Sequence, residues 1–78
     1  MVDMSANNRI EINPKKQHGK PVIRGTRVPV ARIVGGLAGG MSFDEVRKEY
    51  GVSAADIRAA LEFANSLVEK EQFHALPG

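Results

Sequence analysis

Residues 42–60, SFDEVRKEYGVSAADIRAA, predict two helices that follow each other closely. Ser42 is followed three residues later by a glutamate, a capping-box pattern that predicts a helix over 43–50. The same spacing recurs at Ser53 and Asp56, which predicts the start of a second, longer helix. This stretch is therefore expected to contain a helix, a short turn and another helix.

Gly51 separates these two helices and can adopt the left-handed backbone conformation that a tight turn requires. Apolar residues flank it at the spacing expected of two inner helix faces: Val46, Tyr50, Val52, Ile57 and Ala60. Arg47 stands where a small residue usually allows close helix contact. The pattern is that of a helix-turn-helix motif, but a compact three-helix protein can use the same corner without touching DNA. Both interpretations remain open.

A further helix is predicted on the N-terminal side of this segment. The residue before Pro29 is sterically pushed towards the β region, so a helix can begin at Pro29 and not earlier. Its apolar face has helical spacing, and two glycines end it at 39–40. The helix that follows Ser53 carries one apolar stripe and, if it reaches Gln72, is about 28 Å long. Two short helices cannot cover that length, so part of it is expected to contact something else.

Two short strands are predicted before the helices. Residues 9–12 alternate apolar and polar side chains, and 21–24 are short and β-branched, which indicates a hairpin with a long polar loop. The predicted fold is mainly α, with a short N-terminal β-ribbon followed by three helices. We expect residues 1–8 to form a flexible lead, 9–72 a single helix-turn-helix domain, and 73–78 a frayed tail.

Length and composition limit the possible classes of protein. With 78 residues, 42% of them hydrophobic and 26% charged, the chain has room for one small domain. It has no cysteine, so disulfides, thiolate metal sites and thiol nucleophiles are excluded. No apolar run approaches a membrane span, and the N-terminus lacks the pattern of a signal peptide. We therefore expect a cytoplasmic protein that does not enter a membrane.

Charge is distributed unevenly, although the net charge is only +2. Residues 1–41 hold seven Lys or Arg against two acids, for +5, whereas 42–78 hold four against seven, for −3. An anionic partner would therefore meet the first half. The candidate DNA-binding residues are Lys20, Arg24, Thr26, Arg27 and Arg32 there, with Ser53, Ala55 and Arg58 on the long helix, where Ala54 and Ala59 are also expected to be exposed.

Each of these candidates also has a structural interpretation. Arg24 and Arg27 flank a turn, where guanidinium groups often bind backbone carbonyls. Ser53 is explained by capping, and Glu62 on the long helix would repel phosphates. These residues can therefore either contact DNA or stabilise the fold of the chain.

Apolar residues late in the chain are candidates for a partner-binding surface. Phe63 falls off the main stripe of the long helix, and Phe73 lies beyond it, so both are expected to be uncovered in a single subunit. Together with Leu67 they form the predicted partner-binding set. In the alternative, Phe63 only widens the core stripe.

No arrangement of residues indicates an enzyme. His18 and His74 stand far apart without carboxylates at metal-ligand spacing, and no nucleophile is paired with a base. We expect no catalytic residues, no bound metal and no cofactor.

The segment GKPVIRGTRVPV, residues 19–30, resembles the signature of the domain-of-unknown-function 433 family. The resemblance continues through 40–42, Tyr50 and Ile57 to Leu61. It implies a short β element followed by a homeodomain-like helix-turn-helix domain that is often dimeric. Members are commonly encoded beside a toxin with a PIN-like nuclease fold. The resemblance thus implies an antitoxin that neutralises this toxin and can bind its own operator.

A second hypothesis assigns the chain to another class. It is a protein-interaction module that uses the helical corner only for dimerisation or for holding a partner, without binding DNA. The net charge of −3 after residue 41 favours this interpretation.

Overall fold

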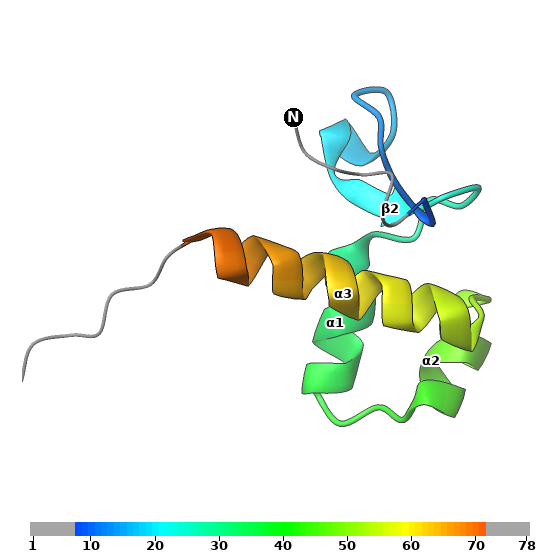
Figure 1. Cartoon of the computed structure of the whole chain (residues 1–78). Helices are drawn as coiled ribbons and strands as arrows, with labels where there is room; N and C mark the ends of the chain where they lie inside the picture. The colour runs from blue at the N-terminus through cyan, green and yellow to red at the C-terminus, as the bar shows by residue number, and fades with distance from the viewer. Residues whose placement is uncertain (1–7, 72–78) are drawn as a thin grey trace, which may run out of the picture.

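A two-stranded hairpin and three helices make up residues 8–71, the part of the chain that the computed structural model describes (Figure 1). In order, the elements are β1 (Ile10–Ile12), the 3-10 turn η2 (Gln17–Gly19), β2 (Pro21–Ile23), α1 (Val30–Ala38), α2 (Phe43–Tyr50) and α3 (Ala54–Glu71). This order confirms the predicted fold class. The predicted lead, apart from its last residue, and the predicted tail lie outside the described residues, as does Phe73.

The hairpin packs against the helices through one face of each strand. β1 and β2 are antiparallel, with Ile10 opposite Ile23, and both side chains are buried in the core. Val22 points to the opposite face and is buried as well. It forms an isolated bridge with Pro29, because the chain returns past β2 before α1 begins. The strand β2 is therefore enclosed on both faces, more than a solvent-exposed ribbon would be.

The helix boundaries follow from local hydrogen bonds. The Ser42 hydroxyl accepts from the Glu45 N–H at 3.0 Å, and the Glu45 carboxylate accepts from the Ser42 N–H at 2.8 Å. Gly51 ends α2 with a φ of 67°, the left-handed conformation predicted for it. Pro29 is the residue before α1, not its first residue, so this helix begins one position later than predicted. Its backbone is extended, as expected of a residue that leads into a helix.

The three helices enclose a core around Ile57, which is 0% exposed. The predicted inner faces of the corner are confirmed: Val46, Val52 and Ala60 are buried and Tyr50 is half-buried. The core continues into α1 and the hairpin through Ile33, Val30, Ile10 and Ile23.

One face of α3 lies against the hairpin, which overturns two predictions. Phe63 and Ala59 are each 7% exposed, although both were expected to be uncovered. They share a helix face with Asp56, whose carboxylate pairs with Arg9 beside β1 at 3.0 Å. The hairpin therefore covers this face. Phe63 belongs to the core, as its alternative interpretation had it.

The C-terminal part of α3 extends beyond the other elements (Figure 1). Leu67 and Val68 on this part are 48% and 54% exposed. This agrees with the expectation that two short helices cannot cover α3. No helix among residues 8–71 combines the length and apolarity needed to cross a membrane.

Candidate interaction surfaces

The turn after β2 is held by the side chain of Thr26. Its hydroxyl donates to the Ile23 carbonyl at 2.7 Å and accepts from the Val28 N–H at 3.0 Å. The backbone N–H of Thr26 also donates to Ile23, and Ile23 in turn donates to the Val28 carbonyl. The hydroxyl thus satisfies backbone groups that water would otherwise have to reach. In the structure the side chain of Thr26 stabilises the turn, and its predicted contact with DNA stays a prediction.

Arg24 binds the first strand through its guanidinium group. Nε donates to the Asn8 carbonyl and Nη2 donates to the Ile10 carbonyl at 3.4 Å. The Arg24 N–H donates to the Arg9 carbonyl at 2.7 Å. This is the structural role expected from the sequence for an arginine beside a turn. The guanidinium of Arg24 donates its hydrogen bonds to backbone carbonyls of the hairpin segment.

Three other cations form ion pairs inside the described part of the chain. These are Arg9 with Asp56 at 3.0 Å, Lys16 with Glu11 at 3.2 Å, and Arg47 with Asp44 at 3.1 Å. Among the predicted DNA contacts, Lys20, Arg27, Arg32 and Arg58 are exposed and take part in none of these pairs. Their charges remain available for an anionic ligand.

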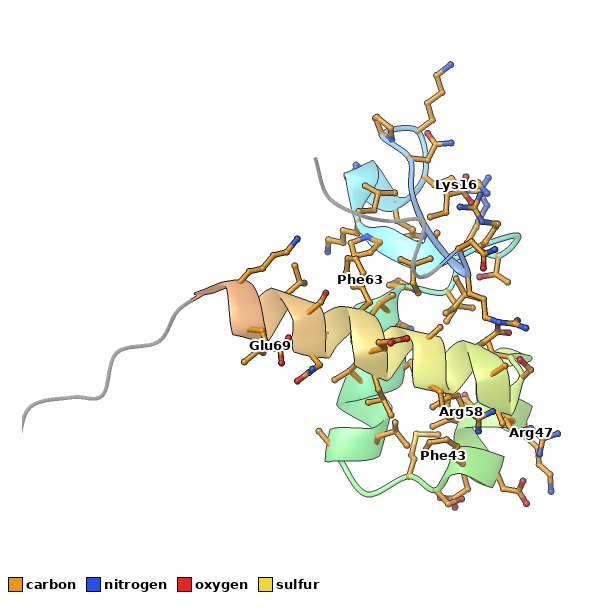
Figure 2. All side chains as sticks on the ribbon, in the orientation of Figure 1. Lys16, Phe43, Arg47, Arg58, Phe63 and Glu69 are labelled. Carbon is orange, nitrogen blue, oxygen red and sulfur yellow. The ribbon has the colours of Figure 1, made fainter. Side chains whose placement is uncertain are left out.

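The residues predicted to contact DNA at the start of α3 differ in exposure and in the hydrogen bonds that their side chains form. The Ser53 hydroxyl accepts from the Asp56 N–H at 3.0 Å and so caps the helix, whereas Ala55 is half-buried. Arg58 is exposed, and Figure 2 shows it on the side of α3 that faces α2, where Arg47 also lies. Of the three predicted contacts on this helix, Arg58 alone offers an unoccupied polar side chain.

Asp56 joins the helix start to the hairpin, a contact that the sequence does not reveal. Its carboxylate accepts from the Ser53 N–H at 3.0 Å and pairs with Arg9, 47 positions earlier. Partial burial raises the pKa of Asp56, but the hydrogen bond from the Ser53 backbone and the Arg9 guanidinium outweigh it, so the pKa of Asp56 is lowered. The pKa of Glu11 is lowered as well, chiefly by its hydrogen bond from Lys16.

Asp56→Asn is expected to reduce the change in the free energy of unfolding between neutral and acidic pH. Since the pKa of Asp56 is lower in the folded chain than in the unfolded one, its ionised form stabilises the fold fully above pH about 4. This contribution is lost as the pH falls through the folded pKa. Urea unfolding at several pH values between 2 and 7 measures it. The free energy of unfolding of the variant should change less over this range.

The control for this experiment is Glu62→Gln, an exposed acid on the same helix that forms no ion pair with another described residue. It should leave the acid dependence as in the wild type. An Asp56→Asn profile that runs parallel to the wild-type profile would contradict the role given to this carboxylate.

An open apolar groove of about 220 Å³ lies between β2, α1 and α3. Its lining residues are Pro21, Val30, Ala31, Val34, Phe63, Ala64 and Leu67. It brings together Phe63 and Leu67, two of the three residues predicted to bind a partner. The α1 side of the groove was not predicted, because the helical pattern assigned Val30 and Val34 to the core and the sequence does not show that a groove borders them.

No group of three or more His, Cys, Asp or Glu side chains within residues 8–71 could hold a metal ion. His18 is exposed in the hairpin loop, and its backbone has a left-handed φ of 58°.

The chain is similar to a curated protein of Mycobacterium tuberculosis (strain ATCC 25618 / H37Rv) named "Putative antitoxin VapB45". The two are 36% identical over 53 residues, which cover 68% of this chain and 22% of the relative. The chain therefore matches only a small part of that protein's length.

Two crystal structures contain a similar fold. A DUF433 member protein from Anabaena variabilis (ATCC 29413) matches with a TM-score of 0.74 and 31% identity, over 86% of this chain and 67% of that one. Rv2018 from Mycobacterium tuberculosis matches with a TM-score of 0.62 and 36% identity, over 67% of this chain and 24% of that one. The family model described as "Protein of unknown function (DUF433)" matches residues 10–64, which include the hairpin, α1, α2 and most of α3. The chain belongs to the DUF433 family.

Proposed function

We propose that this chain is the antitoxin of a toxin–antitoxin pair and that it binds and neutralises a PIN-like nuclease. The observation that carries the proposal is the 36% identity, over 53 residues, to a protein named as an antitoxin. The exposed apolar groove supports it, because an antitoxin must present a surface to its toxin. The nuclease class of the toxin comes from the family resemblance. We further infer that the chain works in the cytoplasm as a homodimer and is not an enzyme.

Copurification tests this proposal. The tagged chain is expressed with the product of the gene beside it, which the proposal requires to be a nuclease, and the mass of the purified complex is measured. A complex that contains both proteins in a fixed ratio is expected, with two copies of this chain. A monomer that elutes without the nuclease would refute the proposal.

DNA binding is the second part of the proposal, and the exposed cations support it. Lys20, Arg27, Arg32 and Arg58 carry charges that no described acid neutralises in an ion pair. Contacts from such side chains to phosphates give affinity that depends strongly on salt and weakly on sequence. We therefore infer that the operator is bound mainly through its backbone.

Arg58→Ala is expected to weaken binding to the DNA upstream of the gene and to make its salt dependence less steep. The loss of one phosphate contact lowers the slope of log K against log salt by about 1. Gel shifts or fluorescence anisotropy at several salt concentrations measure both effects. Lys70→Ala is the matched control, since Lys70 is exposed and forms no ion pair with a described residue but lies at the far end of α3. Equal slopes for the two variants and the wild type would rule out a phosphate contact at Arg58.

A module that binds proteins but not DNA is the second candidate function. It is favoured because Arg24, Thr26 and Ser53 form hydrogen bonds within the domain. Glu62 also lies one helical turn beyond Arg58, where its charge would oppose a phosphate. A chain that binds the nuclease but does not shift its upstream DNA at low salt would establish this alternative.

A further inference from the structure

The groove between β2, α1 and α3 is apolar and small. All seven of its lining residues are apolar. Its volume of about 220 Å³ is below the roughly 300–1,000 Å³ of typical small-molecule sites. A groove of this size fits one or two apolar side chains of another protein better than a cofactor.

Two lysines flank the groove. Lys20 immediately precedes the lining residue Pro21, and Lys70 stands three positions after Leu67 and seven after Phe63, on the same side of α3. Both are exposed, and neither forms an ion pair with a described residue. The groove therefore has positive charge beside its hairpin wall and beside its α3 wall.

Glu69, the acid that precedes Lys70, lies on another side of α3. Glu69 is two positions from Leu67, about 200° around the helix. Figure 2 shows Phe63 on the side of α3 that faces the hairpin and Glu69 on the other side. The charge of Glu69 therefore lies away from the groove, on a different side of α3 from Phe63 (Figure 2).

From these observations, we propose that the groove is the docking site for an apolar segment with acidic flanks on the toxin. One apolar side chain of this segment would enter between Phe63, Ala64 and Leu67, and its carboxylates would lie beside Lys20 and Lys70. Such a site combines burial of an apolar anchor with charge complementarity at the rim. This inference rests on the proposed antitoxin function and specifies where the toxin binds.

A second copy of the chain fits the groove less well. Two identical subunits related by a twofold axis present the same patch to each other. Their grooves would then bring Lys20 and Lys70 of each subunit towards the same lysines of its partner, and like charges at an interface are unfavourable. Charge therefore selects a different, acidic protein.

Adjacent residues of α3 provide a matched test. Leu67 lines the groove and is 48% exposed, whereas Val68 is 54% exposed and is not among the lining residues. Leu67→Glu should weaken binding to the purified nuclease by at least about tenfold, because it places a charge in the apolar site and opposes an acidic segment. Val68→Glu should leave the dissociation constant within about twofold. Calorimetry or surface plasmon resonance gives these constants, and circular dichroism checks that both variants are folded.

A second variant tests the charges separately. The double substitution Lys20→Glu and Lys70→Glu should weaken binding at low salt by about tenfold and by less at high salt, since rim charges act mainly through screened electrostatics. Replacing Glu62 and Glu69 by lysine should not weaken it.

The outcomes separate this inference from the function on which it rests. If the wild-type chain binds the nuclease and Leu67→Glu binds as tightly, the docking site is wrong and the antitoxin function stands. If Leu67→Glu instead turns a dimer into a monomer without changing nuclease affinity, the groove is a contact between copies and the inference is overturned. If the wild-type chain does not bind the nuclease at all, both proposals fail.

Discussion

Ile57→Ala is expected to lower the free energy of unfolding by about 2–5 kcal/mol. Ile57 is 0% exposed and belongs to the same buried cluster as Val46 of α2 and Ile33 of α1. Truncating it removes apolar contacts and leaves a cavity where the helices meet. A small domain has only about 5–15 kcal/mol of stability in total, so the variant should unfold at much lower urea concentration.

Val68→Ala is the matched control for this substitution, because it also shortens an aliphatic side chain of α3 at a position that is 54% exposed. Its effect should be within about 0.5 kcal/mol. Urea unfolding followed by circular dichroism measures both. Equal midpoints for the two variants would show that α3 does not pack against α1 and α2 as described.

Thr26→Val should destabilise the fold by about 1–3 kcal/mol, because it leaves the Val28 N–H in a half-buried turn without its hydrogen-bond acceptor. Valine has nearly the same shape as threonine, so the loss reports the hydroxyl and not packing. Thr26→Ser keeps the hydroxyl and should be much closer to the wild type. Chemical unfolding of the three proteins provides the comparison.

The same pair of variants separates a structural role from DNA recognition. If Thr26 stabilises only the turn, Thr26→Val should be less stable but, while folded, should bind the upstream DNA as the wild type does. A variant with unchanged stability and lost DNA affinity would contradict the role that we assign to this residue.

Two polar side chains of the segment that carries the family resemblance stabilise the hairpin and its turn. Arg24 binds carbonyls of the first strand, and Thr26 holds the turn after the second. The Arg24 guanidinium and the Thr26 hydroxyl form hydrogen bonds with backbone groups of the same chain. The exposed cations Lys20, Arg27, Arg32 and Arg58 support the proposed DNA contacts, and the groove supports the proposed docking of a protein.

Features encoded by neighbouring residues could be predicted from the sequence. The capping boxes at Ser42 and Ser53 and the left-handed glycine at position 51 depend on contacts within a few residues, and they set the limits of α2 and the start of α3. The order of strands and helices follows from the same local patterns.

Features that join distant segments could not be predicted. Phe63 and Ala59 are buried because the hairpin packs on α3, and helical periodicity does not show what lies against a helix face. The Arg9–Asp56 pair joins residues 47 positions apart. The groove is formed by β2, α1 and α3 together, so the sequence predicted only two of its lining residues, Phe63 and Leu67, as candidates for binding a partner.

The central claim is that this DUF433 chain neutralises a nuclease, and a titration tests it most directly. If the gene beside this one encodes the proposed nuclease, nucleic-acid cleavage by its purified product is measured as increasing amounts of the full chain are added. We expect the cleavage rate to fall linearly and to reach background at a fixed molar ratio of the two proteins. A rate that stays constant at a large excess of the chain would contradict the claim.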